Sequence, residues 1–77
     1  MAPATRRTLE AMREHYRLTK AEAAVAALIA EARPVAETAR VLGVSVFTVR
    51  AHLRSIYAKT GVNRQAALVR LVLEQGR

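Results

Sequence analysis

Apolar residues recur at intervals of three and four along most of this chain, with polar and charged residues between them. That spacing places the apolar side chains of a segment on one face of a helix, and it differs from the alternation that a β-strand requires. It predicts five helices, over about 5–16, 20–32, 35–42, 46–60 and 64–75. The expected fold class is therefore all-α.

Residues with strong preferences for helix ends lie between these segments. Thr19 and Glu22 have the spacing of a capping box, in which each side chain accepts a hydrogen bond from the backbone N–H of the other residue. Leu18, just before the box, is placed to pack on the helix that follows. Pro34 ends the second helix, because the residue before a proline disfavours the α conformation, and it suits the first turn of the third helix. Gly43 is the expected end of the third helix.

The segment 46–60 is predicted to be a helix with two unlike faces, begun by an N-cap at Ser45 and ended by Gly61. One face is apolar and comprises Val46, Val49, Leu53, Ile56 and Tyr57. The opposite arc contains no acid and comprises Phe47, Ala51, Arg54 and Ala58, flanked by Arg50 on one side and by Thr48, His52 and Lys59 on the other. A short helix, a turn containing glycine and a longer basic helix are typical of a helix-turn-helix, whose second helix enters the major groove of DNA.

The last predicted helix, with Asn63 as its expected N-cap, is apolar on two sides. One stripe, which suits the core of the domain, comprises Leu68, Leu71 and Val72. The other lies roughly 100–160° away and comprises Ala66, Val69 and Leu73. Either a second copy of the chain covers this second stripe in a homodimer, or the domain itself wraps the helix on both sides.

Charge narrows the choice of partner. The chain carries 13 Lys and Arg against 6 acids, all glutamate, and its formal net charge is +7. No acid occurs between Glu37 and Glu74. Such a one-sided basic block favours a polyanion, either nucleic acid or an acidic membrane surface. A helix lying on a membrane would place large apolar residues opposite its basic face, whereas the exposed arc of 46–60 is rich in alanine, so the expected partner is double-stranded DNA.

Composition argues against other classes of function. Seventy-seven residues make one small domain without cysteine, and the two histidines, His15 and His52, are far apart and have no aspartate nearby. We therefore expect no metal site, no cofactor and no small-molecule ligand within this chain. No nucleophile–base pair or paired carboxylates suggest an enzyme. Without a long apolar run or a secretory signal, the protein is expected to be cytoplasmic and to avoid membranes.

Three groups of residues carry a family resemblance: Leu18-Thr19-x-x-Glu22, Glu37-x-Ala39-x-x-Leu42-Gly43-Val44-Ser45, and Thr48-Val49-Arg50-x-His52-x-x-x-Ile56-x-x-Lys59-x-Gly61-Val62. With these motifs the chain resembles the LuxR/NarL-type (GerE-like) helix-turn-helix DNA-binding domain of bacterial transcription regulators, from Leu18 to about Gln75. The resemblance implies a four-helix DNA-binding domain over 18–77. It leaves 1–17 as an N-terminal extension with a short extra helix, in which residues 1–5 are expected to be loose.

The resemblance also implies roles for single residues. The helix over 46–60 lies in the major groove, where Arg50 and Arg54 reach bases or neighbouring phosphates and Ala51 lies against base edges. Phosphate-facing groups are Ser45, Thr48, His52 and Lys59. Phe47 has two possible places, against a thymine methyl or back against a neighbouring helix. The last helix mediates dimerisation, consistent with the stripe Ala66, Val69 and Leu73.

Three sites depart from the family pattern. Relatives carry Pro-Arg where this chain has Lys20-Ala21, so Glu22 is expected to lack its usual ion-pair partner. Ala32 replaces a glycine, and Val35 opens the third helix where relatives have asparagine. These changes affect the connection between the second and third helices and leave the helix over 46–60 untouched.

The predicted function is sequence-specific binding of double-stranded DNA by a dimeric bacterial transcription regulator. The alternative is a small adaptor that binds RNA polymerase, a sigma factor or another regulator through its last helix, with DNA contact secondary. Substituting Val69 or Leu73 would abolish function in the adaptor, whereas Arg54→Ala would have a mild effect.

Overall fold

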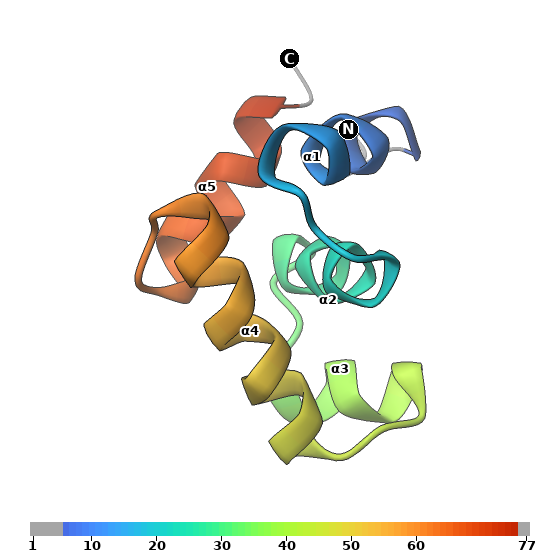
Figure 1. Ribbon diagram of the computed structural model, residues 1–77. Coiled ribbons are helices and arrows are strands. Elements are labelled where there is room, and N and C mark those ends of the chain that lie inside the picture. Colours follow the sequence, from blue (N-terminus) through green and yellow to red (C-terminus); the bar gives the residue numbers. More distant parts are fainter. Residues whose placement is uncertain (1–5, 76–77) are drawn as a thin grey trace.

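A computed structural model describes residues 6–75, which form five α-helices (Figure 1). They are α1 (Arg6–Tyr16), α2 (Lys20–Ala30), α3 (Val35–Leu42), α4 (Val46–Thr60) and α5 (Gln65–Gln75). No strand occurs within these residues, and the prediction of an all-α fold is confirmed. The segment 1–5, including a possible helix start at Thr5, lies outside the described residues.

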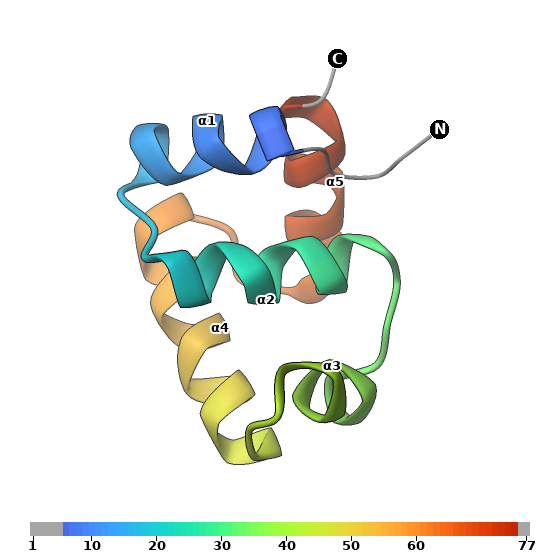
Figure 2. The ribbon, with the colours of Figure 1, turned by 90° about the vertical axis from the view of Figure 1, so that its right-hand side faces the viewer.

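Helix α2 lies between α1 and α3 at the centre of the fold (Figures 1 and 2). It packs against both α4 and α5, while α1 packs on α2 and α5, and α3 packs on α4. The largest side chains enclosed by this arrangement, each at most 1% exposed, are Met12, Val25, Ile29, Val49, Ile56, Leu68 and Val72. Helix α4 is therefore held by α2 and α3 along its apolar stripe, of which Val49, Leu53 and Ile56 are buried.

The predicted helix ends are confirmed at the start of α2 and at the C-termini of α3 and α4. The Thr19 N–H donates to Glu22 Oε1 over 2.9 Å and the Glu22 N–H donates to Thr19 Oγ1 over 3.1 Å, which completes the capping box. Gly43 and Gly61 follow α3 and α4 with φ angles of 70° and 84°. Glycine suits both places because it adopts this left-handed conformation without steric cost.

Helix α2 ends two residues earlier than predicted. Ala30 is its last residue, and Ala32 adopts a left-handed conformation with φ of 63°. The expectation that the second helix includes Ala32 is wrong, because the chain turns at residues 31–32 and leaves Ala32 exposed. The family glycine that Ala32 replaces would adopt this φ with less strain.

Helix α5 begins one residue later than predicted. The carbonyl of Arg64 accepts the first helical hydrogen bond, from the Leu68 N–H at 3.1 Å, so Arg64 occupies the N-cap position. The prediction of Asn63 as the N-cap is therefore wrong. Helix α1 is confirmed, with Met12 fully buried, and Leu9 and Tyr16 are partly buried.

Candidate nucleic-acid interface

The turn between α3 and α4 is short and hydrogen-bonded. After Gly43, the N–H of Val44 donates back to the carbonyl of Ala39 over 3.0 Å. The Ser45 side chain then accepts from the Thr48 N–H over 3.0 Å, and its hydroxyl donates to Thr48 Oγ1 over 3.0 Å. These contacts fix the direction in which α4 leaves α3, and they place the predicted N-cap at Ser45 as expected.

Away from the core, α4 presents an exposed arc. Phe47 is 79% exposed, so the structure favours an outward position for this ring over packing against a neighbouring helix. The other exposed residues on this side of α4 are Ala51, Arg54 and Ala58 in the arc and Arg50 on its flank. One aromatic ring, two arginines and two alanines in this pattern leave room for a close approach by another surface.

The cations of α4 differ in what they contact. Within residues 6–75, no carboxylate lies within ion-pair distance of Arg50 or Arg54. Lys59, in contrast, places its Nζ atom 2.6 Å from Glu22 Oε1 at the start of α2. The two arginines are therefore the α4 cations that remain available to an external anion.

Glu22 is the buried charge that organises the junction of α2 and α4. Only 5% of the residue is exposed, and its carboxylate accepts hydrogen bonds from Lys59, from Ser55 Oγ over 2.5 Å and from the Thr19 N–H. Burial alone would raise the pKa of Glu22. The hydrogen bonds from Lys59, Ser55 and Thr19, together with the positive charge of Lys59, outweigh burial and lower the pKa to about 2.

This junction adds a role that sequence reasoning missed. The usual ion-pair partner of Glu22 is absent, as expected, and other groups take its place: Lys59 and Ser55 reach Glu22 from α4, 37 and 33 residues along the chain. A contact so distant in sequence leaves no pattern within either helix. Whether Lys59 also faces a phosphate stays a prediction.

The two flanks of the exposed arc differ. On one flank lie Thr48, His52, Ser55 and Lys59, and of these Ser55 and Lys59 bind Glu22 at the start of α2. His52 and Thr48 are partly buried. The other flank carries Arg50 and Tyr57, and it faces the first residues of α3 and α5.

That second flank is hollowed. We call the cavity of about 300 Å³ the flank hollow; its lining residues are Val35, Arg50, Leu53, Arg54, Tyr57 and Gln65. Tyr57 was assigned to the apolar stripe and Gln65 to no site, so sequence reasoning missed this grouping. The helical wheel of α4 places Arg50 beside Tyr57, but the addition of Gln65 depends on how α5 folds back.

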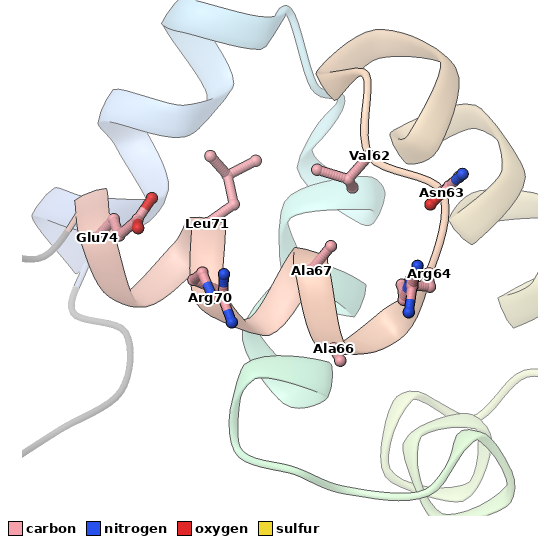
Figure 3. A pocket seen from close by; sticks show the side chains of 8 residues that line it. All are labelled: Val62, Asn63, Arg64, Ala66, Ala67, Arg70, Leu71 and Glu74. Atoms are coloured by element: carbon pink, nitrogen blue, oxygen red, sulfur yellow. The ribbon is translucent and has the colours of Figure 1, made fainter.

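Helix α5 carries a second concave surface, on the outside of the molecule. A cavity of about 470 Å³ is lined by Val62, Asn63, Arg64, Ala66, Ala67, Arg70, Leu71 and Glu74. Figure 3 shows Val62 and Leu71 on the same side of α5, above Ala67, with Arg70 and Glu74 on the same helix as Leu71. A neighbouring cavity brings together the three predicted dimer residues, Ala66, Val69 and Leu73, with Arg70 and Glu74. We call the two cavities together the outer face of α5.

The outer face of α5 is smaller than the helical wheel suggests. Val69 and Leu71 pack partly against the core, and Leu73 is also partly buried, whereas Ala66 is exposed. The domain thus covers one edge of the second stripe and leaves the other open, and a second copy of the chain at the open edge stays a prediction.

Other kinds of site find no support in the described part of the chain. Among residues 6–75, no group of three or more His, Cys, Asp or Glu is placed to hold a metal ion. None of the helices described is long and apolar enough to cross a membrane.

Comparison with known proteins identifies a family that includes the helix-turn-helix. The family described as bacterial regulatory proteins, luxR family, matches residues 16–72, about three quarters of the chain. This range includes α2 to α4 completely and most of α5, and it leaves α1 almost entirely outside. No curated protein and no solved structure matches significantly.

Proposed function

Because the chain belongs to the luxR family of bacterial regulatory proteins, a family of DNA-binding transcription regulators, we propose that it binds specific sequences of double-stranded DNA with α4 in the major groove. We further propose that it does so as a homodimer through the outer face of α5. The family match supports DNA binding as such, and the arrangement of α4 and α5 supports these finer assignments.

The observation that carries the proposal is the exposed arc of α4. Together with Arg50 on its flank, it presents two arginines without carboxylate partners in the described structure, no acid, and alanines at Ala51 and Ala58. An α-helix has about the width of the major groove, so small side chains let its backbone approach base edges while arginines reach them. Arg54 is the residue we assign to base recognition, since a bidentate contact to guanine discriminates by about 1–3 kcal/mol.

At the start of α4, Phe47 and Ala51 are assigned to apolar contacts with thymine methyl groups. Ser45, Thr48 and His52 lie toward the backbone of one DNA strand. The Ser45 hydroxyl already donates to Thr48 Oγ1. A phosphate here would therefore accept from the Thr48 hydroxyl, or from the backbone N–H groups at the start of α4.

The dimer proposal rests on the outer face of α5, where apolar side chains lie beside Arg70 and Glu74. In a two-fold interface the same surface meets itself, so a cation and an acid one helical turn apart allow Arg70 of each copy to face Glu74 of the other. Ala66 permits two helices to cross closely. Dimer-bound half-sites would lie about one turn of DNA apart.

A selection from random duplexes with two matched variants tests the placement of α4. Arg54→Ala removes a cation from the exposed arc, and Arg7→Ala removes one from the part of α1 that lies outside the family match. We expect Arg54→Ala to relax base preference at one position of each half-site and Arg7→Ala to leave the selected motif unchanged. An unchanged motif with Arg54→Ala would contradict the assignment of this residue to the bases.

A further inference from the structure

The flank hollow beside α4 has the chemistry of an anion site. Its floor is apolar, with Leu53 only 5% exposed, and exposed Arg50 and Arg54 lie among its lining residues. No acid lines it. The two arginines make no ion pair within residues 6–75, so their charge is not already neutralised by the described fold.

Two neutral donors complete the hollow. The Tyr57 hydroxyl makes no hydrogen bond to another described residue, although the ring is partly buried. Burial raises the pKa of Tyr57, so its hydroxyl keeps its proton and can donate at neutral pH. Gln65, the first residue of α5, adds an exposed side-chain amide.

The position of the hollow identifies the kind of anion. A helix in the major groove has a sugar–phosphate backbone along each flank, because the groove is only about as wide as the helix with its side chains. On the opposite flank Lys59 is already paired with Glu22. The flank hollow therefore combines arginines that are unpaired within the described residues and a protonated tyrosine hydroxyl beside the exposed arc of α4.

We propose that the flank hollow receives one DNA backbone phosphate in each half-site, bound by Arg50, the Tyr57 hydroxyl and the Gln65 amide. This inference rests on the proposed function and deepens it. Arg54, nearer the middle of the exposed arc, stays free to reach the bases. Because phosphate contacts position a protein on the duplex without reading sequence, the hollow would set the depth and register of α4 in the groove.

Tyr57→Phe tests the proposal with a minimal change, since it removes only the hydroxyl. We expect affinity for all duplexes to fall by about tenfold to a hundredfold, as for loss of a hydrogen bond to a charged group. The dependence of affinity on salt should not change, because a neutral donor releases no counterion. Arg50→Ala should instead lower the salt slope by ~1. The matched control is Tyr16→Phe, on α1, which should bind as the unchanged protein does.

Methylphosphonate substitution then locates the contact. A series of duplexes is made, each with a single uncharged phosphonate at a different backbone position. At one position per half-site, the unchanged protein and Tyr57→Phe should bind with equal affinity, because the phosphate that the hydroxyl contacts has been replaced there. Circular dichroism of the variant confirms its fold. A variant that binds as tightly as the unchanged protein at every position would overturn the phosphate site and leave the proposed function standing.

Other outcomes would overturn the inference in different ways. A change of base preference with Tyr57→Phe would mean that the hydroxyl reads a base. Shifts of the Gln65 side-chain NMR signals on adding inorganic phosphate, together with an unchanged DNA affinity of Tyr57→Phe, would identify a free anion as the occupant. If the unchanged protein selects no sequence and binds no duplex, the proposed function itself fails.

Discussion

Replacing Glu22 by glutamine should destabilise the domain at neutral pH and remove much of its sensitivity to acid. Glutamine keeps the size of the side chain and can still close the capping box with Thr19. It removes the negative charge that Lys59 and Ser55 hold in the buried junction of α2 and α4. The variant therefore isolates the contribution of the charge.

The magnitude follows from the lowered pKa of Glu22. A fall from 4.5 in the unfolded chain to about 2 in the folded one corresponds to at most about 3.4 kcal/mol of stability. The Lys59 side chain is 32% exposed, so water screens part of the attraction. We therefore expect Glu22→Gln to cost about 2 kcal/mol near pH 7, or roughly 8–16 °C in Tm for a domain of this size.

The direction of the pH dependence follows from the same shift. A carboxyl group whose pKa is lowered by folding stabilises the fold above pH 4.5, and that contribution disappears as the pH falls from 4.5 toward 2. More than half of it should be lost by about pH 3. Unfolding in urea, followed by circular dichroism near pH 7 and near pH 3, should thus show the unchanged protein and Glu22→Gln converging in stability at the lower pH.

Glu14→Gln is the matched control, because Glu14 is an exposed acid on α1. It should change stability by less than about 0.5 kcal/mol and keep the acid sensitivity of the unchanged protein. If the difference in unfolding free energy between Glu22→Gln and the unchanged protein were the same at both pH values, the effect would not come from the charge. That result would refute the reasoning.

Three further substitutions test other parts of the account. Ala32→Gly should raise stability by about 1 kcal/mol in the same urea assay, since φ of 63° strains alanine and not glycine. Thr38→Val should raise it by about 1 kcal/mol too, because the Thr38 hydroxyl is buried without a hydrogen-bond partner in the described structure; an equal loss would indicate a bound water. Leu73→Glu should yield a monomer in sedimentation and lose cooperative binding to a two-half-site duplex, whereas an unchanged mass would exclude the outer face of α5 as the dimer contact.

The sequence predicted well the features that short stretches of chain determine. The capping box at Thr19, the left-handed Gly43 and Gly61, and the limits of α4 all depend on residues within one helical turn of each other. The apolar stripe of α4 was also predictable, because helical periodicity alone separates Val49 and Ile56 from the exposed arc.

Features that depend on helices meeting in space were predicted less well. The partner of Glu22 is Lys59, and no pattern within either helix reveals this contact. The early end of α2 at Ala30 was missed because alanine has the highest helix propensity, and the chain nevertheless turns at Ala32. The flank hollow requires Gln65 to lie beside α4, which follows from the path of α5.

The most direct test of the central claim is selection from a random pool of duplex DNA at near-physiological salt, with the mass of the chain in solution measured alongside. Sequence-specific recognition by α4 predicts enrichment of one motif, as an inverted repeat with half-sites about one helical turn apart if the chain is a dimer. Binding that enriches no motif and vanishes as salt rises would show that only non-specific attraction to phosphate remains, and it would contradict base recognition by α4.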